Sequence, residues 1–133
     1  MEEKTFIVER DDALFAAYKN ALRQPDVKSH QQAIRVAISS PTSQFWIEPY
    51  RAYREILWCK NGRRPFRISR HRKELVEDLY REYLRLKEQP MFRDCSTYFV
   101  SQFAACRIAP RGFYISELTA TRIIHRKRYE KRQ

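Results

Sequence analysis

The chain has 133 residues and a formal net charge of +11, from 27 lysine and arginine side chains against 16 aspartates and glutamates. A hydrophobic content of 43% supports a packed core and argues against a wholly disordered chain. Only two glycines are present, which argues against barrels, sandwiches and glycine-rich phosphate loops, because these need glycine where the backbone turns sharply or meets a ligand.

Two helices are predicted in the first third of the chain. Residues 1–10 are predicted to form a short strand or arm, and Asp11 and Asp12 then offer an N-cap for a helix that runs to about Arg23. A second helix is predicted from about Ser29 to Ser39, because its apolar residues recur at helical spacing and Pro41 follows it.

Four more helices are predicted after a turn at Pro41. Glu48-Pro49 indicates the start of the third helix and Asn61-Gly62 its end, since proline is tolerated at the first helical position and glycine favours a helix stop. The fourth covers residues 70–88, the fifth starts near 94 or 96 and ends before Pro110, and the sixth follows Ser116. The predicted class is therefore all-α, a single domain over residues 1–133 with about six helices. Residues 44–47 and 112–115 are candidates for a short strand pair.

One segment pattern occurs twice. Residues 45–56 align without gaps on residues 113–124, so that Phe-Trp-Ile lies over Phe-Tyr-Ile, Ala52 over Ala120 and Arg54 over Arg122. The matches favour a duplicated helix–turn–strand–helix unit, with pseudo-repeats at about 11–62 and 70–130. The alternative is that a hydrophobic staple before a helix recurs by chance.

The Pro-Arg-Gly-Phe-Tyr-Ile-Ser stretch at residues 110–116, followed by Ala120 and Arg122, resembles a segment of small, basic, uncharacterised proteins of Bacteroides-type bacteria and their mobile elements. The resemblance covers about the last quarter of the chain. It implies a bacterial or phage setting and carries no activity with it.

The last two predicted helices are typical of a helix-turn-helix, in which the second helix enters the major groove and flanking cations hold phosphates. Against this interpretation, the connection from Pro110 to Ser116 is longer than the usual compact turn, and Glu117 would repel phosphate. The residues predicted to contact nucleic acid are Arg51, Arg54, Arg63, Arg64, Arg67, Arg111, Thr119, Thr121, Arg122, Arg126, Lys127 and Arg128.

Positive charge is segregated along the chain. Residues 51–73 hold nine cationic side chains and one anionic one, residues 107–133 hold eight and two, and the rest of the chain is slightly acidic. Such segregation is the electrostatic footprint of a nucleic-acid-binding protein, although a solvated tail explains residues 126–133 equally well.

No pattern indicates catalysis, a cofactor or a metal. His30, His71 and His125 are isolated, and none stands at ligand spacing from a cysteine or carboxylate. The three cysteines show no CxxC spacing, and their odd number precludes complete pairing, so we expect reduced thiols. With no signal-like start and no long apolar run, the sequence predicts a cytoplasmic protein without a membrane partner.

The sequence thus predicts a non-enzymatic protein that binds duplex DNA through helix-turn-helix-like repeats, as a regulator or accessory factor of a mobile element. RNA is not separated from DNA as the ligand, and a homodimer would be the usual way to double the site. The alternative is an interaction or assembly module with a basic face for an acidic protein partner. An exposed patch of Phe45, Trp46, Phe113 and Tyr114 would favour this alternative.

Overall fold

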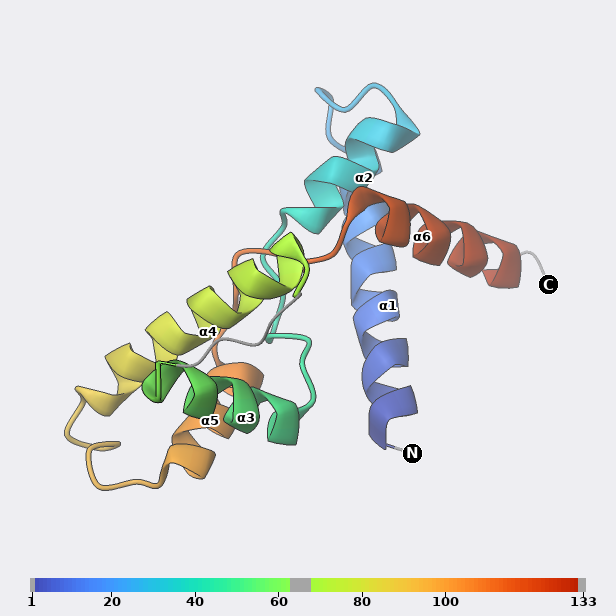
Figure 1. The fold of residues 1–133 in the computed structure, drawn as a ribbon. Coiled ribbons are helices and arrows are strands. Elements are labelled where there is room, and N and C mark those ends of the chain that lie inside the picture. Colours follow the sequence, from blue (N-terminus) through green and yellow to red (C-terminus); the bar gives the residue numbers. More distant parts are fainter. Residues whose placement is uncertain (1, 63–67, 132–133) are drawn as a thin grey trace. The chain divides into compact units, whose positions relative to one another are not determined.

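The computed structural model describes residues 2–62 and 68–131, and these residues form helices and their connections, without a strand. In chain order the helices are α1 (Glu2–Leu22), α2 (His30–Ile38), α3 (Pro49–Lys60), α4 (Arg70–Lys87), α5 (Thr97–Arg107) and α6 (Glu117–Lys131) (Figure 1). The predicted all-α class with about six helices is confirmed for the described residues.

Helix α1 begins at Glu2, so the predicted strand or arm before Asp11 is wrong. The β-branched pair Ile7 and Val8, which suggested a strand, lies exposed on the helix surface. The buried side chains Asp11, Leu14 and Tyr18 stand three and four residues apart and form one helical face. Asp11 is therefore inside the helix and does not cap it.

The other helix starts lie where the sequence places them. Four of these starts, those of α2, α4, α5 and α6, use a serine hydroxyl that accepts a hydrogen bond of 3.1 Å from the backbone N–H three residues later. These serines are Ser29, Ser69, Ser96 and Ser116. Helix α3 begins differently. The Glu48 carboxylate, directly before Pro49, accepts hydrogen bonds from the backbone N–H groups of Tyr50 and Arg51. These are local interactions, which explains why the sequence pattern predicts them.

The helices form two compact units. The first unit contains α1, α2 and α6, and both shorter helices pack against α1. The second contains α3, α4 and α5, each of which packs against the other two. The units cut across the predicted repeats, because α3 follows α2 in the chain but packs with α4 and α5.

The predicted strand pair is not formed in the described residues, because both segments bond to helix ends. In the second unit the Phe45 N–H donates to the Ala105 carbonyl near the end of α5, at 2.8 Å. In the first unit the Phe113 N–H donates to the Ile38 carbonyl at the end of α2, at 2.9 Å. These bonds satisfy carbonyls that a helix leaves unpaired at its C-terminus.

The segment before α6 lies very close to α2. An added Cβ on Gly112 would stand 2.7 Å from the Ile38 carbonyl oxygen, so only glycine fits at this position without a shift. Tyr114 then adopts a left-handed backbone conformation with φ of 56°. This tight turn places Ser116 at the start of α6.

Candidate nucleic-acid interface

The aromatic residues of the two similar segments are buried or half-buried. Phe45 and Phe113 are 1% and 3% exposed, Trp46 is also buried, and Tyr114 is half-buried. They therefore do not form the exposed patch that the interaction-module alternative needs. Their burial holds the segments before α3 and α6 in place.

The helix pair predicted as a helix-turn-helix does not occur in either unit. Helix α5 packs against α3 and α4, whereas α6 packs against α1 and α2. A helix-turn-helix requires its two helices to pack on each other, so that the first supports the second in the groove. The interpretation of α5 and α6 as such a motif therefore finds no support within either unit and stays a prediction.

Two of the predicted phosphate contacts on α6 are engaged by acids of α1. Arg126 pairs with Asp11, which is 2% exposed, and Lys127 pairs with Asp12. Arg10 donates to the same Asp11 carboxylate at 2.9 Å. The hydrogen bond to Asp12 raises the pKa of Lys127. These ion pairs join α6 to α1, and their role in phosphate binding stays a prediction.

The remaining predicted residues near α6 are two threonines and three arginines. The Thr121 hydroxyl donates to the Glu117 carbonyl, the Thr119 hydroxyl lies 2.9 Å from Ser116 Oγ, and Arg111 is exposed. Arg122 is exposed and Arg128 half-buried, and neither makes an ion pair with the described residues. These two arginines are therefore available for phosphate contacts.

A cluster of arginines lies on α3 and the start of α4. Arg51 and Arg54 are exposed on successive turns of α3, and the Arg54 guanidinium lies 5.3 Å from the centre of the Trp58 ring. Arg72 of α4 lies nearby: burial lowers its pKa, the charge of Arg51 lowers it further, and Glu55 raises it. Arg51 and Arg72 make no ion pair within the described residues, so like charges stand close together without direct neutralisation. We call Arg51, Arg54 and Arg72 the α3 arginine cluster.

Three further predicted contacts, Arg63, Arg64 and Arg67, lie outside the described residues. Arg72 was not singled out from sequence, although it belongs to the basic segment 51–73. The structure therefore brings Arg51 and Arg54 together with a cation that sequence reasoning missed.

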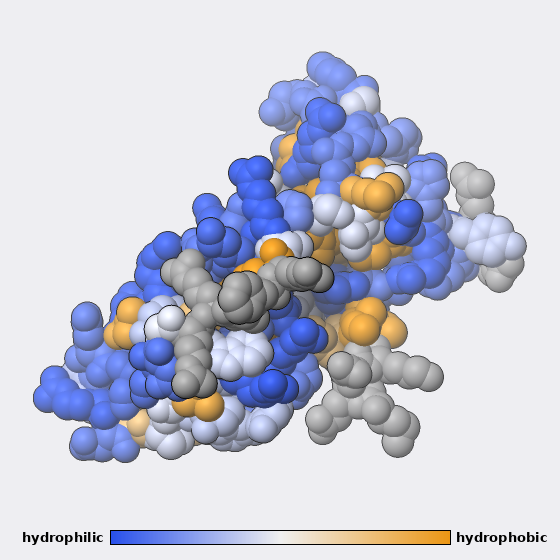
Figure 2. Space-filling view, viewed as in Figure 1, coloured by the Kyte–Doolittle hydropathy of each residue, from blue (hydrophilic) through white to orange (hydrophobic). Residues whose placement is uncertain are grey.

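The face seen in Figure 2 is covered mostly by hydrophilic side chains, with hydrophobic ones in smaller groups.

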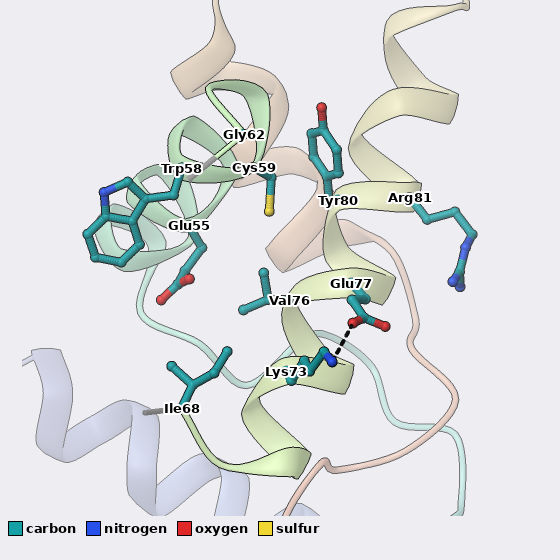
Figure 3. A pocket seen from close by; sticks show the side chains of 10 residues that line it. All are labelled: Glu55, Trp58, Cys59, Gly62, Ile68, Lys73, Val76, Glu77, Tyr80 and Arg81. Carbon is teal, nitrogen blue, oxygen red and sulfur yellow. Dashed lines mark ion pairs between the residues drawn. The ribbon is translucent and has the colours of Figure 1, made fainter. Parts of the chain in front are cut away.

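A pocket of about 590 Å³ opens between α3 and α4 beside this cluster. Its walls are Glu55, Trp58, Cys59, Ile68, Val76 and Tyr80, and an ion pair of 4.0 Å between Lys73 and Glu77 stands at its side (Figure 3). A second hollow of about 240 Å³ is lined by Arg51 and Arg54, and it shares Glu55 and Trp58 with the first. We call these two hollows the α3 crevice.

Glu55 is the unusual residue of the α3 crevice. It is 3% exposed, and its Oε2 atom accepts no hydrogen bond from the described residues. Figure 3 shows its carboxyl group directed between Trp58 and Val76. The only available signal was that Glu55 is the single acid in residues 51–73 and directly precedes the core residue Ile56.

Comparison of the chain with protein-family models, with curated proteins and with solved structures finds no match. The resemblance of residues 110–116 stays a prediction. Within residues 2–62 and 68–131, no helix is long and apolar enough to cross a bilayer. The same residues bring no three histidine, cysteine or carboxylate side chains together as a metal site.

Proposed function

We propose that this chain binds nucleic acid, with the α3 arginine cluster as its main phosphate-binding surface. The observation that carries the proposal is the grouping of Arg51, Arg54 and Arg72, in which the Arg54 guanidinium lies 5.3 Å from the centre of the half-buried Trp58 ring. Arginine matches phosphate through its planar fork and stacks on bases, and a bound phosphate would relieve the repulsion between neighbouring guanidinium groups. Duplex DNA is the ligand that the sequence predicts and the first to test.

We also propose that the chain contains a duplicated three-helix unit whose third helix is exchanged between the copies. Two features support this: Ala52 and Ala120 are both fully buried, while Arg54 and Arg122 are both exposed. The segments before the two helices bond in the same way, to the end of α5 in one unit and of α2 in the other. Helices α3 and α6 are then equivalent, and Arg122 is the counterpart of Arg54 in a second, weaker phosphate contact.

Fluorescence anisotropy with a labelled random duplex, measured between about 50 and 200 mM salt, tests the proposal. The logarithm of affinity should fall linearly with the logarithm of salt concentration. In a variant with Arg51→Gln and Arg54→Gln, this decline should become shallower. The magnitude of its slope should drop by about 0.9 for each phosphate that the variant no longer neutralises. Arg122→Gln should have a smaller effect in the same direction.

A matched control removes two positive charges elsewhere in the second unit, at Arg85 and Arg93. Both are exposed, and neither lines the α3 crevice. This control should keep most of the wild-type salt slope. If both double variants lose affinity equally, binding follows net charge alone and the assignment to the α3 arginine cluster is wrong. If the wild type binds neither duplex nor single strand at low salt, the function is wrong and an acidic protein partner becomes the better hypothesis.

A further inference from the structure

The carboxylate of Glu55 lacks the hydrogen bonds that a buried charge normally has. Moving a carboxylate out of water without a replacement donor is costly, and most buried polar atoms in proteins have a partner. Arg72 offers partial compensation, since Glu55 raises its pKa, but no described donor reaches Oε2. The acceptor is therefore unpartnered, and a ligand can supply its donor once the Glu55 side chain turns toward the pocket that it lines.

The walls around this acceptor suit a flat aromatic ligand. Trp58 and Tyr80 are half-buried at the edge of the pocket, and Ile68 and Val76 add aliphatic surface. The volume of about 590 Å³ lies within the range of pockets that hold small organic ligands. Stacking on tryptophan is a common way to hold an unpaired base.

The arrangement of charges matches a nucleotide. Glu55 and Trp58 line both hollows of the α3 crevice, whereas Arg51 and Arg54 line only the smaller one. A base in the larger pocket would leave its phosphate beside these arginines.

We propose that the α3 crevice binds an unpaired guanine, with Glu55 accepting hydrogen bonds from the base; this inference rests on the proposed function. An ionised carboxylate only accepts hydrogen bonds. On its pairing edge, guanine presents two adjacent donors, N1–H and the N2 amino group. Adenine and cytosine place a ring acceptor beside their amino group, and thymine and uracil flank one N–H with two carbonyl oxygens. Pairing through both carboxylate oxygens requires Glu55 to turn about its terminal torsion, which is soft.

Binding of labelled oligothymidylate heptamers that carry one central guanine, adenine, cytosine or thymine tests this inference. The full chain should bind the guanine heptamer about tenfold more tightly than the others, since a good bidentate pair discriminates by about 1–3 kcal/mol. Glu55→Gln has the same shape, so it should fold, as a thermal melt would verify. It should bind all four heptamers within about twofold of one another, at an affinity no lower than that of wild type for thymine.

Trp58→Leu should weaken binding of all four heptamers through loss of stacking, while Arg85→Gln should leave the guanine preference unchanged. Competition by guanosine monophosphate identifies the source of the base. Displacement at concentrations close to those of the heptamer indicates a free nucleotide, and displacement only at far higher concentrations indicates a nucleic-acid strand.

Equal affinity of the wild type for the four heptamers, with a normal salt slope, would overturn the guanine inference and leave the proposed function standing. A guanine preference that survives in Glu55→Gln would also overturn it. Failure of every heptamer and duplex to bind at low salt would remove both proposals together.

Discussion

Replacing Gly112 by alanine should destabilise the first unit by about 1.5–4.5 kcal/mol. The added Cβ would lie 2.7 Å from the Ile38 carbonyl oxygen, and the contacting atom belongs to the backbone at the end of α2, which has little freedom to move. Relieving the overlap costs about 1–3 kcal/mol, as for other overpacked sites. The same carbonyl accepts the Phe113 N–H, and weakening that bond adds about 0.5–1.5 kcal/mol.

The assay is urea unfolding followed by two probes. Far-UV circular dichroism reports the helices of both units, whereas both tryptophans, Trp46 and Trp58, lie in the second unit. With a slope of about 2 kcal/mol per molar urea, the circular dichroism midpoint of Gly112→Ala should fall by roughly 1–2 M. The fluorescence midpoint should fall less if the units unfold separately.

The other glycine of the chain provides the control. Gly62 has a positive φ of 69°, and an added Cβ there would meet no atom within 4 Å. Its replacement by alanine should cost only the backbone strain of a left-handed residue, about 1–2 kcal/mol. A circular dichroism midpoint for Gly112→Ala equal to that of wild type would refute the steric reasoning.

Three further variants test the packing of the core and of α6. Asp11→Asn should cost about 2 kcal/mol of unfolding free energy, because it weakens a buried acceptor while Arg126 can return to water; an unchanged urea midpoint would contradict this. The raised pKa of Lys127 stabilises the fold at pH values below its unfolded pKa near 10.5, and this stabilisation is lost as pH rises through the higher folded pKa. Asp12→Asn removes the hydrogen bond that raises this pKa. It should therefore reduce the difference between the urea midpoints measured at pH 9 and above pH 11. Phe45→Ala should lower stability by about 3–5 kcal/mol, measured by the same unfolding experiment, and a value below 1 kcal/mol would indicate a surface role for this ring.

The sequence predicts those parts of the fold that depend on neighbouring residues. Serine caps such as Ser69 and the Glu48-Pro49 start act within one turn of helix, so a short pattern contains the whole interaction. The start of α1 was missed because its β-branched residues favour a strand locally. The helical face of α1 is instead satisfied by long-range contacts with α2 and α6.

The packing of α3 with α4 and α5, and of α6 with α1 and α2, could not be read from the pattern for a related reason. The segments that begin at Phe45 and Phe113 are alike, so their composition does not show which helix end receives each one. The basic segment 51–73 led to Arg51 and Arg54, because net charge is visible in sequence. Glu55 was missed, since the burial of one acid among many cations depends on how α3 and α4 pack.

The division of the chain between the two units also sets an order of events during synthesis. The second unit is a continuous stretch, residues 43–110, so its three helices can associate as soon as that stretch has left the ribosome. The first unit needs α6, whose Arg126 pairs with Asp11 across 115 residues of sequence. Until α6 emerges, the faces of α1 and α2 that α6 covers lack that partner, which exposes the nascent first unit to aggregation and to chaperone binding.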